Sequence, residues 1–331
     1  MDRPVRFAEV DLIKAVGALA VLLIHTVRSP FEAAASAPEL WLGQLTRFAV
    51  PGFLAASGFL YATREHVGWA TTRGRLVRLA LPYLLFSAIA QALRHLQGPA
   101  LWGTGSGSLW IDLIFGASLG PYYYVFIAAL LVCATPSFAR LSPRGLYALL
   151  AIELVLQLAF EFASGLSFFW HLRNPLLWAA WFHLGWWTRL HHDSLAALAN
   201  QHRSALVGGC SLAIAACAAV LTLDLPPTRG RIVEWIVIFP TLGALLFAGC
   251  GNERPKRLAR PVRLLSDASY TIYLAHPLFV IPLRQLFPAA PGRFEPLTLA
   301  TVWGLALAGS LAVALLSRTL LGRRSRNWLG S

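Results

Sequence analysis

The stretch VDLIKAVGALAVLLIHTV, residues 10 to 27, is an apolar run of nearly bilayer-spanning length that carries three ionisable side chains, Asp11, Lys14 and His25. A hydrocarbon core about 30 Å thick needs about 20 mostly apolar helical residues. Similar runs recur along all 331 residues, of which 57% are hydrophobic and only 13% charged. This composition excludes a typical soluble domain and favours a membrane protein with many spans.

Windows of this length, bounded by charged residues, proline or glycine, predict an all-α bundle of about ten transmembrane helices. The bundle is expected to form one integral membrane domain over residues 1–331, with membrane lipid as its surroundings. A shorter piece, residues 109 to 119, is about half a span long and is expected to be interfacial or re-entrant. The ten windows are residues 10–27, 43–63, 76–93, 121–139, 145–163, 174–190, 204–223, 232–250, 266–287 and 297–317.

The net charge of +13 comes from cations spread over short loops, not massed on one face with aromatic residues, so no nucleic-acid partner is predicted. With the N-terminus inside, the inner loops hold 19 Lys and Arg residues and the outer loops 7. The positive-inside rule therefore predicts that both termini are cytoplasmic.

No metal site is predicted from spacing. The four cysteines fall within spans and form no CxxC pair, so they are interpreted as small packing residues. One polar cluster precedes the seventh window, but its spacing matches no standard ligand pattern. Its members are His191, His192, Asp193 and His202.

The three ionisable residues of the first window fall within about 40° of one helical stripe. A charge at mid-membrane costs at least about 2.5 kcal/mol, so this stripe should face the bundle interior or a wet cavity. Asp11 and Lys14, at i and i+3, either pair or anchor the helix at the interface. His25 lies about 20 Å above Asp11 and is either a general base or a histidine that packs between helices.

The next two windows carry arginines. In LTRFAVPGFLAASGFLYAT, residues 45 to 63, Arg47 is expected to be buried, while Pro51, Gly52 and Gly58 let the helix kink and pack closely. In RGRLVRLALPY, residues 73 to 83, Arg75 and Arg78 lie one turn apart. They could form a fork for phosphate oxygens or simply anchor the helix at the cytoplasmic face.

The ninth window opens LLSDASYTIYLAHPLFV, residues 264 to 280. Ser266 is a plausible helix N-cap, and Ser269, Tyr273 and His276 share one stripe. Pro277 should free a backbone carbonyl one turn earlier, near Tyr273. His276 alone could equally be a core histidine. Further polar residues lie in spans without a local pattern that assigns them a role: Glu153, Gln157, His183 and Glu234.

Taken in order, five stretches resemble the acyltransferase-3 family of integral membrane acyltransferases, in its branch of short O-acetyltransferase-like proteins. The stretches are VDLIKAVGALAVLLIH, RFAVPGFLAASGFL, the R-x-x-R of residues 75–78, PYYYVFIAALL and SYTIYLAHP. No single stretch is very specific, but the five occur in the family's order and cover almost the whole chain.

The resemblance implies transfer of an acyl group, usually acetyl, from cytoplasmic acyl-CoA (acetyl-CoA) to a hydroxyl of a cell-surface polysaccharide, a lipid-linked sugar or a similar acceptor. It also implies a multi-pass protein of the bacterial cytoplasmic (inner) membrane. The matching residues are His25, the first-helix histidine; Arg75 and Arg78, in acyl-CoA use; Tyr273 and His276, in the ninth-helix motif; Arg47 and Ser57, in the second helix; and Asp11, in the opening motif.

Two residues depart from the family pattern. Lys14 stands where arginine is usual, which keeps a charge for coenzyme binding but loses the planar fork. Leu54 stands where a second phenylalanine is common, after Gly52 and Phe53. Ser57, Ser269 and Asp11 are expected to be structural or to line the substrate cavity.

A mechanism follows as a hypothesis. The coenzyme phosphates stay at Arg75 and Arg78, while the acyl-pantetheine arm reaches into a cavity lined by the first, second and ninth helices. His25 takes the acceptor proton, or carries the acyl group itself, and Arg47, Tyr273 or His276 stabilises the oxyanion. The rival interpretation is a transporter or flippase of anionic lipid-linked sugars, which would also use arginine and histidine in broken helices. The absence of an inverted repeat counts against it.

Overall fold

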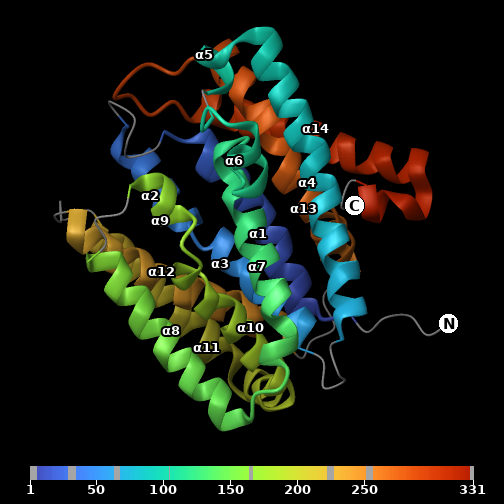
Figure 1. The fold of residues 1–331 in the computed structure, drawn as a ribbon. Helices are drawn as coiled ribbons and strands as arrows, with labels where there is room; N and C mark the ends of the chain where they lie inside the picture. Colours follow the sequence, from blue (N-terminus) through green and yellow to red (C-terminus); the bar gives the residue numbers. More distant parts are fainter. Residues whose placement is uncertain are drawn as a thin grey trace. The chain divides into compact units, whose positions relative to one another are not determined.

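The predicted fold class, all-α, is confirmed. The computed structural model describes residues 6–28, 35–62, 68–103, 105–163, 167–221, 227–250 and 256–328, and within these ranges the regular elements are helices (Figure 1). The chain divides into two compact units. The first unit comprises Met1–Ala62 and Trp181–Ser269, and the second comprises Thr63–Ala180 and Tyr270–Ser331. The prediction of one domain over the whole chain stays a prediction.

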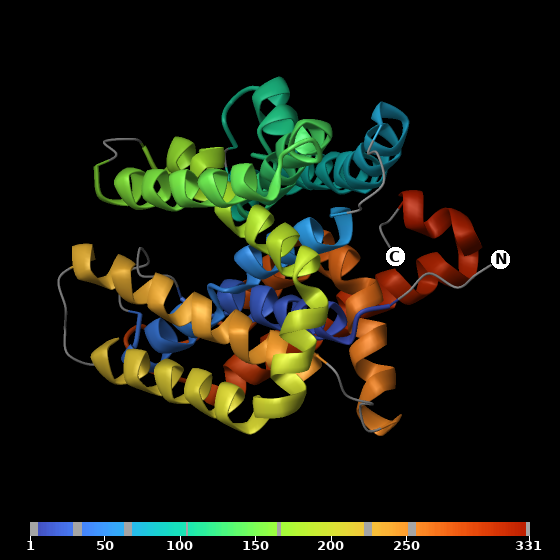
Figure 2. The same cartoon turned by 90° about the horizontal axis from the view of Figure 1, so that it is seen from below.

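The first unit is built around α1, Ala8–Thr26, which packs against α3 and α12. Small side chains on α1 and α3 let these helices approach closely: Ala18 and Ala56 are buried, and a Cβ at Gly17 would touch the ring of Phe53 at 3.4 Å. Figure 2 shows α11 and α12 side by side. The unit contains α2 (Ala37–Thr46), α3 (Ala49–Tyr61), most of α10 (Ala179–Leu190), α11 (His192–Leu221), α12 (Pro227–Gly249) and the beginning of α13 (Lys256–Leu286).

The prediction of a single helix over residues 43 to 63 is wrong, because the helix is interrupted between the end of α2 and the start of α3. Pro51 has no N–H to donate to the carbonyl of Arg47, and its ring crowds that carbonyl. The Arg47 N–H donates to the Gln44 carbonyl at 3.2 Å, as in a 3₁₀ turn, and a regular bond resumes from Gly52 to Phe48 at 2.7 Å. The kink expected from Pro51 is therefore present, and it places Arg47 at the joint.

The second unit contains the long α4, Trp69–Gln97, which packs against α7, and the C-terminal part of α13. Its half-length segment forms only α6, Leu109–Ile114, a helix too short to span a membrane, and its predicted interfacial or re-entrant position stays a prediction. The other elements are α5 (Pro99–Trp102), η1 (Gly120–Tyr122), α7 (Tyr123–Phe138), α8 (Pro143–Ala163), α9 (Phe168–Leu172), η2 (Pro175–Leu177), α14 (Pro296–Leu321), η3 (Gly322–Arg324) and α15 (Ser325–Trp328).

The prediction of one spanning helix over residues 174 to 190 is also wrong. The Asn174 side chain accepts a hydrogen bond from the Leu176 N–H at 3.1 Å and starts the 3₁₀ turn η2. This turn ends at Trp178, and the following helix, α10, has 12 residues. A helix of that length is too short to cross a hydrocarbon core.

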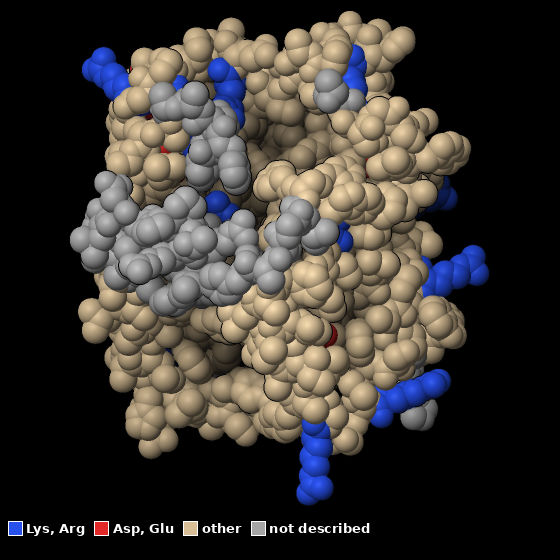
Figure 3. Space-filling model, turned by 60° about the vertical axis from the view of Figure 1, so that its left-hand side comes forward, with Lys and Arg blue, Asp and Glu red and all other residues tan. Residues whose placement is uncertain are grey.

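Five helices of the described residues are long and apolar enough to cross a membrane: Trp69–Gln97, Gly120–Phe138, Pro143–Phe160, Ala259–Leu286 and Pro296–Leu321. Several of them expose large apolar side chains; Ile152 and Val155 on α8 are 56% and 66% exposed. Charged side chains are sparse on the face drawn in Figure 3. Exposed apolar helices are matched to lipid, so the chain is a membrane protein. The count of ten spans and the cytoplasmic termini stay predictions.

Candidate functional site

The predicted stripe on α13 faces protein, since Ser269, Tyr273 and His276 are all buried. His276 Nδ1 lies 2.8 Å from the Tyr273 carbonyl oxygen and 3.2 Å from that of Ile272. Pro277 has no N–H for the Tyr273 carbonyl, so the freed carbonyl that the sequence predicted is present and the imidazole occupies it. Because carbonyl oxygens only accept hydrogen bonds, Nδ1 of His276 carries a proton.

The PYYY stretch and the α13 motif form one structure, which we call the tyrosine cluster: Tyr122, Tyr124 and Tyr273. The Tyr273 hydroxyl donates to the Pro121 carbonyl, and the Tyr122 hydroxyl donates to the Leu274 carbonyl at 2.6 Å. The Tyr124 and Tyr273 rings meet edge to face, with centroids 5.0 Å apart. The Tyr273 proton is thus used in a hydrogen bond within the protein, and its oxyanion role stays a prediction.

The arginine pair of α4 lies in the same unit as the tyrosine cluster. Leu79 follows Arg78 directly, and its carbonyl accepts a hydrogen bond from the Tyr270 hydroxyl at 2.7 Å. Tyr270 precedes Tyr273 by three residues and His276 by six, which are about 4.5 and 9 Å of helical rise. The segment of α4 next to Arg78 therefore contacts α13 within about two turns of His276. Arg78 is exposed and its Nε donates to the Gly74 carbonyl at 3.1 Å.

Asp11 is held by a residue that the sequence analysis did not weigh. Arg6 donates to both carboxylate oxygens of Asp11, at 2.9 and 3.2 Å, and to Asp267 at 2.8 Å. Hydrogen bonds to Asp11 first, and then to Asp267, raise the pKa of the Arg6 guanidinium. Arg6 lies outside the apolar window of residues 10–27, so the helical stripe of that window does not include it. The pairing of Asp11 with Lys14 stays a prediction.

The prediction that Ser266 caps a helix is wrong. Because α13 begins at Lys256, Ser266 lies well inside the helix, and its hydroxyl donates to Asp11 Oδ1 at 2.7 Å. It thus fastens α13 to α1 within the first unit. This contact explains why a polar residue is tolerated at a fully buried position.

The other predicted site residues of the first unit lie on neighbouring helices. His25 is half-buried in the last turn of α1, Arg47 is half-buried at the joint between α2 and α3, and Ser57 is half-buried on α3. Helices α1 and α3 pack against each other. The catalytic roles of His25 and Arg47 stay predictions.

A polar centre that the sequence analysis missed surrounds Asp112 of α6. Its buried carboxylate accepts hydrogen bonds from Gln91 Nε2 at 2.9 Å, Arg94 at 3.0 Å and the Ser106 N–H at 2.8 Å. Burial opposes ionisation of Asp112, but the hydrogen bonds from Gln91, Ser106 and Arg94 outweigh it and lower its pKa. An acidic residue within an apolar segment was the available signal.

Arg173 fastens the same segment directly after α6. It donates to the carbonyls of Phe115 at 2.8 Å and Gly116 at 3.1 Å, and burial lowers the pKa of its guanidinium. The half-length segment of the second unit is thus held by two arginines, the half-buried Arg94 and the buried Arg173.

The unassigned polar residues of the spans are also buried where the structure describes them. Glu153 and Gln157 lie one turn apart on α8, and His183 lies on α10. The side chain of Glu234, and any pairing with Arg231, lies outside the described residues. The structure assigns none of these residues a role.

Comparison with known proteins gives one match. A family model described as an acyltransferase domain matches residues 7–319, which include all the motif residues above. No curated protein and no solved structure matches the chain. The matched range covers most of the chain, and the helices are those of a membrane protein. The chain therefore belongs to the acyltransferase-3 family of membrane acyltransferases.

Proposed function

We propose that the chain is an O-acyltransferase of the bacterial inner membrane. It moves an acyl group, in our proposal acetyl, from cytoplasmic acyl-CoA to a hydroxyl of a cell-surface polysaccharide, a lipid-linked sugar or a similar acceptor. Family membership supports acyl transfer in general. The observation that carries the finer proposal is the contact of Tyr270 with the Leu79 carbonyl, which joins the arginine end of α4 to the α13 motif.

The donor is assigned to the second unit. The coenzyme carries several phosphates, and two guanidiniums one turn apart on α4 offer planar forks for phosphate oxygens. With the phosphates at Arg75 and Arg78, the acyl-pantetheine arm extends along α13 toward the tyrosine cluster and His276. The arm is long enough to reach into a helical bundle.

The chemistry needs a base for the acceptor hydroxyl and a donor for the oxyanion. We assign the base to His25, which takes the hydroxyl proton while the oxygen attacks the thioester carbonyl. The carbon–sulfur bond then breaks, and the coenzyme leaves as a thiol after receiving that proton. Arg47 stabilises the oxyanion, because its charge is permanent. Tyr273 and His276 are the other candidates for this role.

Transfer of label from radiolabelled acetyl-CoA to a panel of glycan acceptors tests this proposal with the purified full chain. His25→Ala should lower the rate by about 10²- to 10⁴-fold, the usual effect of losing a general base. His95→Ala, at an exposed position on α4, is the matched control and should transfer at the native rate.

Two results would contradict the proposal. Transfer at the native rate by His25→Ala would remove that residue from the mechanism. Movement of a labelled lipid-linked sugar across proteoliposomes without any acylation would favour the transporter or flippase instead.

A further inference from the structure

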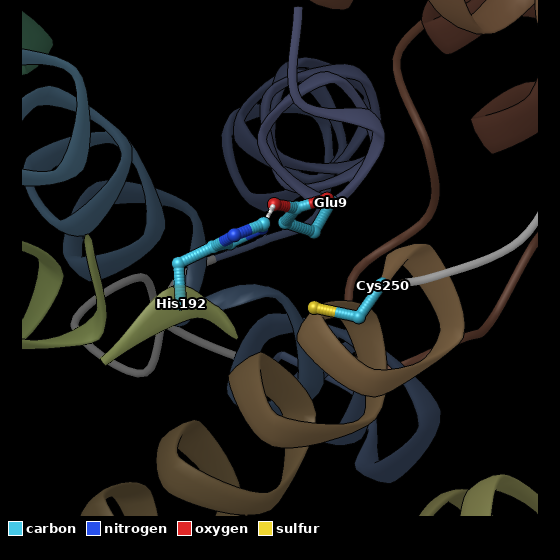
Figure 4. Close-up of side chains that lie close together, drawn as sticks. All are labelled: Glu9, His192 and Cys250. Carbon is cyan, nitrogen blue, oxygen red and sulfur yellow. Dashed lines mark hydrogen bonds and ion pairs between the residues drawn. The ribbon is translucent and has the colours of Figure 1, made fainter. Parts of the chain in front are cut away.

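Three side chains with metal-binding atoms meet in the first unit, in a cluster that the acyl-transfer proposal does not use. Glu9 lies in the first turn of α1, His192 is the first residue of α11, and Cys250 directly follows α12 (Figure 4). His192 Nε2 lies 2.7 Å from Glu9 Oε1, and the oxygen, nitrogen and sulfur atoms all lie within 4.8 Å of one another. Among the described residues, these three side chains lie close enough together to hold one metal ion.

The backbone holds these residues in place. A Cβ at Gly249 would lie 2.3 Å from the Glu9 Cα, so only glycine lets α12 end directly against α1. The next residue, Cys250, is fixed by a hydrogen bond from Arg203 to its carbonyl oxygen. The close approach and the hydrogen bond together place the thiol next to the carboxylate.

The imidazole is also oriented from several sides. The rings of Phe7 and Phe59 meet it edge to face, with centroids 5.1 and 5.7 Å away. Its second nitrogen, Nδ1, lies 3.4 Å from Asp193 Oδ1. A carboxylate on the far nitrogen of a histidine is the arrangement that orients metal ligands and fixes their tautomer.

Burial makes a cation at this place favourable. Glu9 is 3% exposed and Cys250 is 0% exposed, whereas the His192 side chain is 19% exposed. A buried carboxylate is costly unless a cation compensates it.

We propose that Glu9, His192 and Cys250 bind one Zn²⁺ ion, with water at the fourth position on the more exposed His192 side. A set of one oxygen, one nitrogen and one sulfur donor suits zinc, whereas calcium and magnesium take oxygen donors. Zinc bonds of about 2.0–2.3 Å in a tetrahedron place neighbouring donors about 3.5 Å apart. The Glu9–His192 pair must therefore open by less than about 1 Å. Binding releases the thiol proton, and one carboxylate and one thiolate then balance the charge of the ion.

The ion would join three helices that are far apart in the sequence. Residues 9 and 192 are separated by 183 positions. The bound metal would fix the start of α1, two residues before Asp11, and hold the ends of α11 and α12 against it. This is a stabilising role within the first unit, and it is independent of the proposed acyl transfer.

Cobalt substitution tests the site in the full chain, purified in detergent and stripped of metal by a chelator. Co²⁺ should bind with a stoichiometry of one and give a sulfur-to-cobalt charge-transfer absorption, which added Zn²⁺ removes. Cys250→Ser should abolish that absorption, and Cys210→Ser, elsewhere in the first unit, should keep it. His192→Gln and Glu9→Gln should keep the thiolate absorption but weaken Co²⁺ affinity by about 100-fold or more.

Zinc should raise the thermal midpoint of the native chain, and His192→Gln should need a higher zinc concentration for the same rise. An absence of the charge-transfer absorption in the native chain, or the same absorption in Cys250→Ser, would overturn the proposal. If Cys250→Ser does not fold, the two glutamine variants decide, because unchanged cobalt affinity in both would overturn it as well.

Discussion

Two glycines determine how closely α3 and α10 cross in the first unit. A Cβ at Gly58 would lie 1.8 Å from the Phe182 carbonyl oxygen, and a Cβ at Gly185 would lie 1.9 Å from the Ala55 carbonyl oxygen. Each helix therefore presses its backbone on a glycine of the other. We predict that Gly58→Ala destabilises the protein, since both obstructing atoms belong to the backbone and cannot rotate away.

The magnitude follows from the geometry. Real Cβ atoms essentially never approach a heavy atom within 3.0 Å, so the helices must separate by about 1 Å. Overpacking a close contact costs about 1–3 kcal/mol, whereas glycine to alanine within a helix gains about 0.5–1 kcal/mol. Because Phe182 is fully buried at this crossing, the separation also loosens its packing. We therefore expect a net loss of about 2 kcal/mol, or a fall in the thermal midpoint of about 4–8 °C.

The assay is thermal unfolding of the purified chain in detergent, followed by tryptophan fluorescence. Gly208→Ala is the matched control, because a Cβ there meets nothing within 4 Å on α11, and it should keep or slightly raise the midpoint. Gly185→Ala should act like Gly58→Ala, and the double variant should lose less than the sum, because one separation relieves both contacts. Equal midpoints for Gly58→Ala and Gly208→Ala would refute the reasoning.

Further predictions concern polar contacts. The lowered pKa of Asp112 contributes stability that is fully present above its usual pKa of 3.8 and is lost as the pH falls through the folded-state pKa. The thermal midpoint of Asp112→Asn should therefore depend less on pH in that acidic range, and parallel curves would count against it. Tyr122→Phe removes the hydrogen bond to the buried Leu274 carbonyl and should cost about 0.5–1.5 kcal/mol in the same unfolding assay. Arg6→Ala should lower the midpoint, and adding Asp11→Asn should restore part of it, because the carboxylate left without Arg6 carries the penalty; no recovery would contradict this.

The sequence predicted the helices well where apolar composition alone decides them. The windows that became α1, α4, α7, α8 and α14 agree with the structure to within a few residues at most ends. One error lies at the start of α13, which begins at Lys256, before the predicted window, and the other errors described above lie where a single backbone group interrupts a helix. Pro51 was correctly predicted to kink the helix, but the loss of the hydrogen bond to the Arg47 carbonyl, one turn earlier, was not predicted. The turn at Asn174 was missed because the residues around it are apolar and nothing in their pattern indicates a break.

Contacts between distant segments could be predicted only in part. The freed carbonyl of Tyr273 was local and was predicted, whereas the hydrogen bond from Tyr122 to Leu274 joins residues 152 positions apart. Glu9 and His192 are farther apart still, so a search for ligand spacing in the sequence examined the neighbours of His192 and missed its partner. Residues that meet only in the folded chain leave no periodic signal.

The proposed acyl transfer depends above all on Arg75 and Arg78 holding the phosphates of the acyl donor. The direct measurement compares the KM for acetyl-CoA with that for acetyl-pantetheine, which lacks the nucleotide and its phosphates, in the native chain and in Arg75→Ala plus Arg78→Ala. The double variant should raise the KM for acetyl-CoA by about 10- to 100-fold, the effect of losing hydrogen bonds to a charged group, and leave the KM for acetyl-pantetheine unchanged. Arg73→Ala, an exposed neighbour on α4, should change neither value. Equal effects of the double variant on both donors would contradict the claim.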